Sequence, residues 1–175
     1  ARTDLNKPLS ESGAVFIVPS DTPGFKPDYL HEKSSQRLAT NGCFHLQDCK
    51  IPVKNILLGE GKLVELRGKY MPCSKAEAAA TVLGVGRSAY EYAFNYVKKR
   101  KQGGKMIIDH QAVAMMISKM TMLLDGARLQ IWKAAWLADN QHPDARIQGL
   151  ISKVRASEAA FEVCTLATEI LGGAV

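Results

Sequence analysis

The sequence predicts an α+β protein, mainly α, in which part of an antiparallel β-domain precedes the long antiparallel helices of a four-helix bundle. In the first 60 residues, short apolar runs alternate with turn residues. From about Ser74 onward, three long stretches place apolar residues at helical spacing. Period-two alternation is typical of strands and a period near 3.6 of helices. The change in composition near residue 60 therefore predicts two domains, residues 1–60 and residues 61–175.

Three short segments of the first domain favour strands. Residues 14–18 are apolar and are followed by the turn-rich residues 19–24. Apolar and polar side chains alternate over residues 44–47, and residues 50–53 form the third segment. Three short strands cannot form a closed sheet by themselves. We therefore expect them to be part of a larger β-domain.

Each of the three helices has recognisable boundary residues. The starts and ends are marked by Ser74 and Gly103–Gly104, by Asp109 or His110 and Leu137, and by Pro143 and Gly172–Gly173. All three stretches exceed ~25 residues, which is long for a globular domain. Three such helices lack one partner of a four-helix bundle, and we expect the fourth from sequence outside this chain or from another subunit.

The net charge and a basic cluster suggest an anionic partner. The 175 residues include 23 Lys and Arg against 17 Asp and Glu, a formal charge of +6. Residues 98–101 are all basic, and Lys105 follows the Gly103–Gly104 pair. Two interpretations stay open: a solvated helix C-terminus that opposes the helix dipole, or a phosphate-binding loop. No standard nucleotide-binding loop is present. Tyr92 and Tyr96 have the spacing of core residues, so nucleic acid is not expected as a partner.

Several other residues have both a structural and a functional interpretation. Glu169 lies at the unfavourable end of a helix dipole, which fits either a ligand or chain partner or a simple exposed carboxylate. His110–Gln111 could cap the second helix. We expect a core role for Met106, Met115, Met116, Met120 and Met122 and for Trp132 and Trp136. The four cysteines are scattered and predict buried, reduced thiols. No apolar run is long enough for a membrane-spanning helix, and no metal-ligand spacing appears.

The order of the motifs resembles that of the acyl-CoA dehydrogenase family across essentially the whole chain. In the first half the resemblance rests on residues 18–24, Gln36–Arg37, residues 48–52 and residues 55–57. In the helical half it rests on residues 84–89, Tyr96, Arg100–Lys101, Gly104–Lys105, His110–Gln111, residues 134–136 and residues 170–173. This resemblance implies that residues 1–60 are the C-terminal part of a middle β-domain. Residues 61–175 would be an incomplete C-terminal helical bundle domain.

The resemblance also implies an FAD flavoprotein that forms a homotetramer. Arg100 and Gln111 stand where the family contacts the pyrophosphate and adenosine of a neighbouring subunit's FAD. Glu169, Gly172 and Gly173 stand where it contacts the same cofactor. Arginine offers paired donors to phosphate, and glycine lets backbone N–H groups approach it. In this family Gln is commoner than Glu at position 169, and Gly103 replaces a usual aromatic residue.

The family reaction forms an α,β double bond in an acyl-CoA and passes electrons to an electron-transfer flavoprotein, as part of fatty acid metabolism. Its carboxylate base usually lies beyond the position of Val175, so no catalytic residue is expected within this chain. In a minority of members the base stands where Ser74 is, and serine cannot take that role; Glu77 is three residues away. Ser74 and Lys75 stand at substrate-binding positions, where Lys keeps the charge of the family's usual Arg, and Pro72 replaces an Asp.

These departures keep two alternatives to the dehydrogenase open: a flavin-dependent monooxygenase of the same fold, and a non-catalytic family member. Pro72 and Ser74 favour the monooxygenase, which needs neither a carboxylate base nor CoA. The resemblance and the cysteines suit either a bacterial cytoplasm or a mitochondrial matrix.

Overall fold

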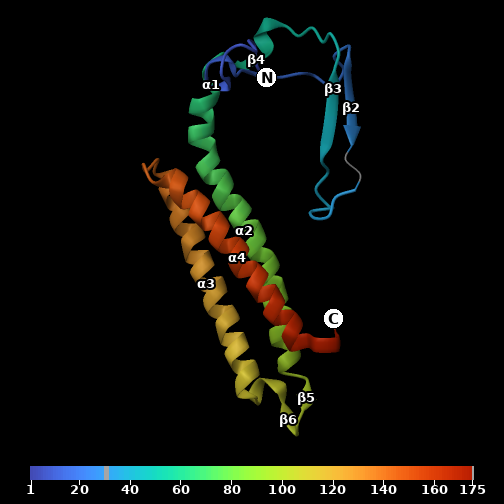
Figure 1. The fold of residues 1–175 in the computed structure, drawn as a ribbon, viewed down its shortest axis with the longest axis vertical. Helices are drawn as coiled ribbons and strands as arrows, with labels where there is room; N and C mark the ends of the chain where they lie inside the picture. Colours follow the sequence, from blue (N-terminus) through green and yellow to red (C-terminus); the bar gives the residue numbers. More distant parts are fainter. Residues whose placement is uncertain (30–31, 175) are drawn as a thin grey trace. The chain divides into compact units, whose positions relative to one another are not determined.

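The computed structural model describes residues 1–29 and 32–174, which form two compact units, Ala1–Leu66 and Arg67–Val175. The first unit contains mainly short strands, and the second contains the long helices (Figure 1). The mainly α fold predicted from the sequence is confirmed.

The first unit holds two separate two-stranded antiparallel sheets. Strand β1 (Val15–Phe16) pairs with β4 (Ile56–Leu58), and β2 (Phe25–Tyr29) pairs with β3 (Gly42–Leu46). A short helix α1 (Leu9–Ser12) and a 3₁₀ turn η1 (Val53–Asn55) complete it. Every residue of β3 is exposed, and the buried residues found among the described ones of this unit are Ser12, Gly13 and Ala14. The unit therefore has little core of its own.

The strand predicted at residues 50–53 is wrong. Pro52 instead directly precedes the turn η1, and the strand β4 begins only after that turn, at Ile56. Proline has no N–H group to donate to a sheet, which excludes it from most strand positions. The strand β2 was not predicted, because Pro27 interrupts its pattern. Its partner β3 starts two residues earlier than the predicted segment.

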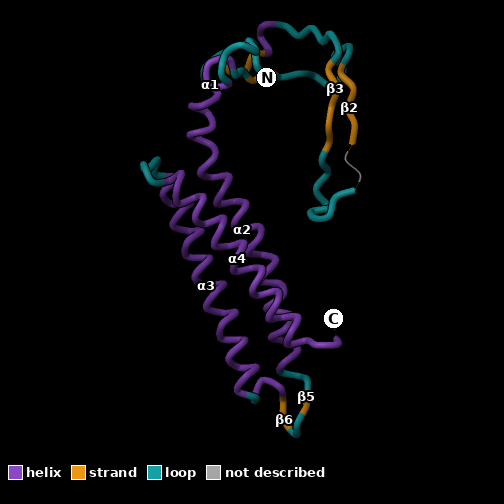
Figure 2. The backbone as a smooth tube through the Cα atoms, in the orientation of Figure 1, coloured by secondary structure: helices purple, strands orange, loops and turns teal. Residues whose placement is uncertain are grey.

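The second unit consists of three long helices that run alternately up and down (Figures 1 and 2). They are α2 (Leu63–Val97), which begins in the first unit, α3 (Gln111–Asp139) and α4 (Ala145–Leu171). A small hairpin of β5 (Lys101–Gln102) and β6 (Lys105–Met106), followed by the 3₁₀ turn η2 (Ile107–Asp109), connects α2 to α3. A last 3₁₀ turn, η3, covers Gly172–Ala174.

The predicted helices are confirmed as elements, but both ends of the first are in error: α2 ends at Val97, and the predicted end at Gly103–Gly104 lies in a β-hairpin instead. Helix α2 begins at Leu63, well before the predicted Ser74, and Pro72 lies inside it. A proline within a helix removes one backbone hydrogen bond, so the sequence suggests a start after it. Here Pro72 is buried, and a Cβ on Gly149 would lie 3.1 Å from its carbonyl oxygen, so this part of α2 is packed closely against α4. At the other end of the unit, Gly172 ends α4 with a positive φ of 56° and donates its N–H to Thr168.

The core lies where the three helices face one another. On α3 the buried residues follow a spacing of three or four, as in an amphipathic helix. On α4 they are mostly small, which lets neighbouring helix backbones come close. The buried residues of the core cluster include Leu83 and Val97 of α2, Ile117, Met120, Leu124 and Ile131 of α3, and Ala156, Ala159, Val163, Ala167 and Ile170 of α4.

Several core predictions are wrong. Met120 is fully buried as expected. Met115, Met122, Trp132 and Trp136 are instead 64%, 75%, 63% and 62% exposed. They lie on the face of α3 opposite to the core residues, where Met115, Met122 and Trp136 are spaced by multiples of seven residues. Apolar character alone did not distinguish the two faces.

Two further burial predictions fail in the same way. Tyr92 is 64% exposed, although its spacing from Tyr96 is that of core residues. All four cysteines are free, as predicted, but Cys43 and Cys73 are exposed and Cys49 and Cys164 are half-buried. None of the helices described is long and apolar enough to cross a membrane.

Two glycines of α2 provide a matched test of its packing against α4. A Cβ at Gly86 would lie 3.0 Å from the Cα of Ala160 and 3.2 Å from its Cβ, whereas a Cβ at Gly84 would meet nothing within 4 Å. Gly84→Ala should raise the free energy of unfolding by up to ~1 kcal/mol, because alanine favours the helix. Gly86→Ala should lower it by about 1–3 kcal/mol, because the helices must move apart. Urea denaturation of the two variants measures the difference; equal gains would show that α2 and α4 do not touch there.

Candidate functional site

The connection from α2 to α3 is a tight β-hairpin whose turn requires glycine. After Val97 the chain leaves the helix, and the N–H groups of Lys99 and Arg100 both bond to the carbonyl of Tyr96 at 3.0 Å. Gly103 and Gly104 then form the turn, with φ values of 61° and 78°. A two-residue turn with two positive φ values is the type that matches the twist of a hairpin, and glycine adopts it without strain.

Three hydrogen bonds fasten this hairpin to the segment that leads into α3. The N–H of Ile107 donates to the carbonyl of Arg100 at 2.9 Å. The Lys105 Nζ donates to the carbonyl of Asp109 at 2.7 Å. The third bond joins the His110 Nε2 to the carbonyl of Gln102 at 3.0 Å. The hairpin is therefore attached to the start of α3 through both side chains and backbone.

The role predicted for His110 needs correction. His110 does occupy the position before the first residue of α3, but its side chain makes no capping hydrogen bond. The ring reaches back to the hairpin instead. This partner lies eight residues earlier in the sequence, and only the closed hairpin brings it near. No cue in the sequence indicated that bond, although the Gly103–Gly104 pair was a signal for the turn itself.

The alternation of the helices brings the predicted cofactor residues to one end of the bundle (Figure 1). This hairpin end, residues 98–111 and 169–173, follows the end of α2 and contains the start of α3 and the end of α4. It includes all five predicted cofactor-contact residues, and each of them is exposed: Arg100, Gln111, Glu169, Gly172 and Gly173. They are therefore accessible to a large ligand or to another subunit.

The hairpin end carries a strong local excess of positive charge. Its cations are exposed: Lys98, Lys99, Arg100, Lys101 and Lys105. The ammonium group of Lys98 lies 3.7 Å from the centre of the Phe94 ring. Helix α3 begins here without a side-chain cap, and the start of an uncapped helix favours a negative charge. Together these features can attract and hold an anionic group such as a phosphate.

The predicted substrate residues lie elsewhere in the second unit. Ser74 and Lys75 are on α2, 23 and 22 residues before its last residue, which places them roughly 35 Å from the hairpin end. Both are half-buried, and a Cβ on Gly149 would lie 3.3 Å from the Cβ of Lys75. Glu77 is exposed on the same helix. The bundle therefore keeps the two predicted sets of residues apart.

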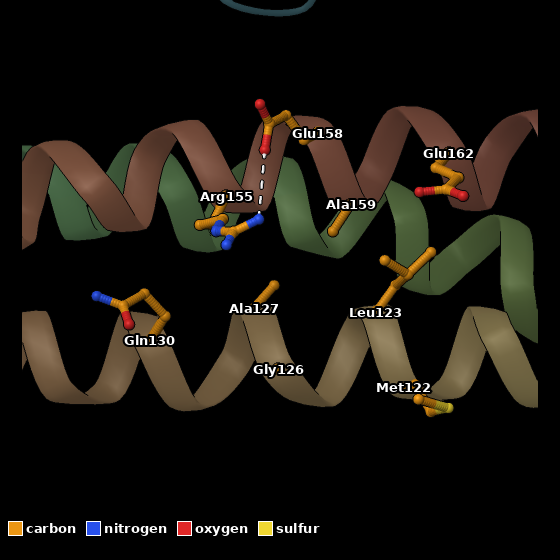
Figure 3. Close-up of a pocket in the computed structure, with 9 residues that line it drawn as sticks. All are labelled: Met122, Leu123, Gly126, Ala127, Gln130, Arg155, Glu158, Ala159 and Glu162. Atoms are coloured by element: carbon orange, nitrogen blue, oxygen red, sulfur yellow. Dashed lines mark ion pairs between the residues drawn. The ribbon is translucent and has the colours of Figure 1, made fainter.

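Several open grooves mark the surface of the bundle. One groove of about 340 Å³ lies between α3 and α4 (Figure 3), and a larger, more apolar groove of about 690 Å³ lies between α2 and α4. In the first, Arg155 and Glu158 form an ion pair at 3.8 Å. Neither groove is lined by a predicted site residue. Among the described residues, no three His, Cys, Asp or Glu side chains gather as metal ligands would.

Comparison with known protein families identifies the helical unit. The sequence model of the acyl-CoA dehydrogenase C-terminal domain matches residues 71–175. The chain belongs to the acyl-CoA dehydrogenase family. This confirms the resemblance found in the sequence. Members of this family are flavoproteins.

Individual members of the acyl-CoA dehydrogenase family match nearly the whole chain. A probable acyl-CoA dehydrogenase of Bacillus subtilis is 31% identical over 173 residues, which are 99% of this chain and 45% of the relative. The human mitochondrial short-chain specific acyl-CoA dehydrogenase is 30% identical over 91% of this chain, which corresponds to 39% of that relative's length. The butyryl-CoA dehydrogenase structure from Megasphaera elsdenii superposes with a TM-score of 0.91 at 30% identity, covering 99% of this chain and 45% of that one. The chain thus spans less than half the length of these relatives.

The position of Glu169 leads to a prediction about stability. Glu169 is exposed in the last turn of α4, and none of the ion pairs found among the described residues includes it. Removing its charge with Glu169→Gln should stabilise the ligand-free protein by about 0.3–1 kcal/mol, because a carboxylate opposes the helix dipole there. Glu77→Gln, in the middle of α2, is the control and should change stability less. Thermal melting at low and high salt measures the effect, which salt should reduce; a gain that salt leaves unchanged would contradict the dipole explanation.

Proposed function

We propose that this chain is part of an FAD-dependent acyl-CoA dehydrogenase that forms an α,β double bond in an acyl-CoA thioester. The observation that carries the proposal is the match of nearly the whole chain, in sequence and in fold, to enzymes named for that activity. Because the chain spans less than half of those enzymes, the complete protein must supply the rest of the active site. We expect these 175 residues alone to be inactive.

The proposed domain division assigns residues 1–60 to the end of a middle β-domain and residues 61–175 to an incomplete C-terminal helical bundle. The small core of the first unit supports the first assignment, since its strands expose most of their side chains. The family match to residues 71–175 supports the second. The fourth helix of the bundle would come from outside this chain.

The exposed residues of the hairpin end fit an FAD molecule held by a neighbouring subunit. Arg100 would donate to the pyrophosphate, and Gln111 would contact the adenosine side. Glu169, Gly172 and Gly173 would approach the same cofactor from the end of α4. These residues suit this role because the pyrophosphate is anionic. The hairpin end is basic and contains the start of α3, which has no side-chain cap. Such a shared site requires a homo-oligomer, which we propose to be a tetramer.

The proposed reaction divides between this chain and the rest of the protein. FAD, when bound, would supply the acceptor for a hydride from the β-carbon of the substrate, and a carboxylate would take the α-proton. That base must be kept dry so that its pKa approaches neutrality. We place it outside this chain, because Ser74 cannot serve as the base; Glu77 is the nearby carboxylate within the chain. Ser74 and Lys75 would contact the substrate.

The proposed electron acceptor is an electron-transfer flavoprotein. The proposed compartment is a bacterial cytoplasm or a mitochondrial matrix. The relatives include a bacterial and a mitochondrial enzyme, so they are compatible with both compartments. An acceptor of this class would receive electrons after the acyl-CoA has been oxidised.

A flavin-dependent monooxygenase of the same fold is the second candidate. Pro72 and Ser74 favour it, because neither supplies the charged groups expected near the substrate of a dehydrogenase. Pro72 is buried against α4, so it offers no group to a substrate. A non-catalytic family member would differ from both in binding no flavin.

An absorption spectrum of the complete protein, recorded without oxygen, should distinguish these functions. We expect a yellow protein whose flavin absorption is bleached by one or more members of a panel of acyl-CoA thioesters. A yellow protein that none of them bleaches, but that consumes oxygen when its flavin is reduced, would favour the monooxygenase. A colourless protein that takes up no added FAD would overturn both enzymatic functions.

Arg100 provides the direct test of the proposed cofactor contact. Arg100→Ala should weaken FAD binding roughly 10- to 100-fold, because a charge-assisted hydrogen bond to phosphate is lost. Arg146→Ala is a matched control, since Arg146 is an exposed arginine at the opposite end of α4. Titration of the flavin-free protein with FAD measures both dissociation constants. Equal FAD affinities in the two variants would show that Arg100 does not contact FAD.

A further inference from the structure

The ring of His110 packs closely against the tip of the hairpin. A Cβ at position 103 would lie 3.3 Å from the His110 Cε1 and 3.5 Å from its Nε2. The Nε2 is 3.0 Å from the carbonyl oxygen of Gln102. Since a carbonyl oxygen only accepts hydrogen bonds, the Nε2 must carry a hydrogen and donate it. His110 is thus in contact with the turn through both a hydrogen bond and its ring.

The position of His110 connects two residues of the proposed cofactor site. Gln111 follows it directly as the first residue of α3, and Arg100 directly precedes the first strand of the hairpin. The backbone of Arg100 is itself bonded to Ile107 in the segment before His110. A change in the contact between His110 and the hairpin would therefore move Arg100 relative to Gln111.

We propose that His110 is a positioning residue, which holds the hairpin on the start of α3 so that Arg100 and Gln111 face one anionic ligand together. This inference rests on the proposed function, in which that ligand is the pyrophosphate and adenosine part of FAD. Arg100 and Gln111 are exposed, so ordering them at the moment of binding would cost entropy. A hairpin already fixed by His110 reduces that cost.

The first test removes the donor and then restores it. His110→Leu keeps a side chain of substantial size but has no N–H group to donate. The side-chain amide of His110→Gln can donate a hydrogen bond from about the same distance as the histidine Nε2. In the complete flavoprotein, His110→Leu should speed hydrogen exchange of the hairpin amides and raise the FAD dissociation constant about 5- to 10-fold. His110→Gln should recover most of both. In an Arg100→Ala background, His110→Leu should have a much smaller effect on FAD affinity, because the two residues act together.

The two turn glycines give an independent test that leaves His110 in place. Gly103→Ala and Gly104→Ala both force alanine into a left-handed conformation, so they share that strain. Only the Cβ at position 103 would press on the His110 ring, since the one at 104 meets nothing within 4 Å. Gly103→Ala should therefore weaken FAD binding more than Gly104→Ala does. In a His110→Ala background the difference between the two should disappear.

The possible results separate this inference from the proposed function. Faster hairpin exchange and weaker FAD binding in His110→Leu, both restored by Gln, support the positioning role. Faster exchange with unchanged FAD affinity would overturn it while leaving the FAD site intact. If the unmodified protein binds no FAD, the proposed function fails and the positioning role fails with it. Equal losses for Gly103→Ala and Gly104→Ala would also contradict the contact on which the inference depends.

Discussion

The close approach of α4 to α2 is the constraint on which the rest of the second unit depends. Two glycines face the opposite backbone directly: Gly86 lies against Ala160, and Gly149 lies against Pro72. Added Cβ atoms at these positions would fall 3.0–3.1 Å from backbone atoms, which leaves no room for larger side chains. The close packing of α2 and α4 therefore requires glycines, which have no side chain, as much as it requires large apolar side chains elsewhere. Dispersion between closely packed backbones contributes where apolar side chains are small.

This packing determines which functional residues can meet. With α2 and α4 held close and α3 antiparallel to both, the end of α2, the start of α3 and the end of α4 lie at one end of the unit. Residues more than 60 positions apart in the sequence, such as Arg100 and Glu169, thereby share that end. The same geometry separates Ser74 and Lys75 from them by most of the length of a helix. One rigid scaffold can thus serve two regions of a large ligand or two different ligands.

The sequence predicted the class of fold and the three long helices because apolar periodicity is strongest in long elements. It also predicted that glycines would end α4 and form the turn before α3. It failed where the outcome depends on tertiary contact: Pro72 remains inside α2 because α4 covers it. Trp132 and Trp136 are exposed because the described core uses the other face of α3. The contact of His110 with Gln102 required the closed hairpin, which no local pattern specifies.

The short connections between the long helices also have a consequence for how the second unit folds. Helices α3 and α4 are joined by residues 140–144, and α2 and α3 by a single small hairpin. The extensive contacts between α3 and α4 therefore join segments that follow one another along the chain. Low contact order of this kind is associated with fast folding, because little chain entropy is lost before contacts form. The α3–α4 pair has the shorter connection, so it is the natural nucleus on which α2 can assemble.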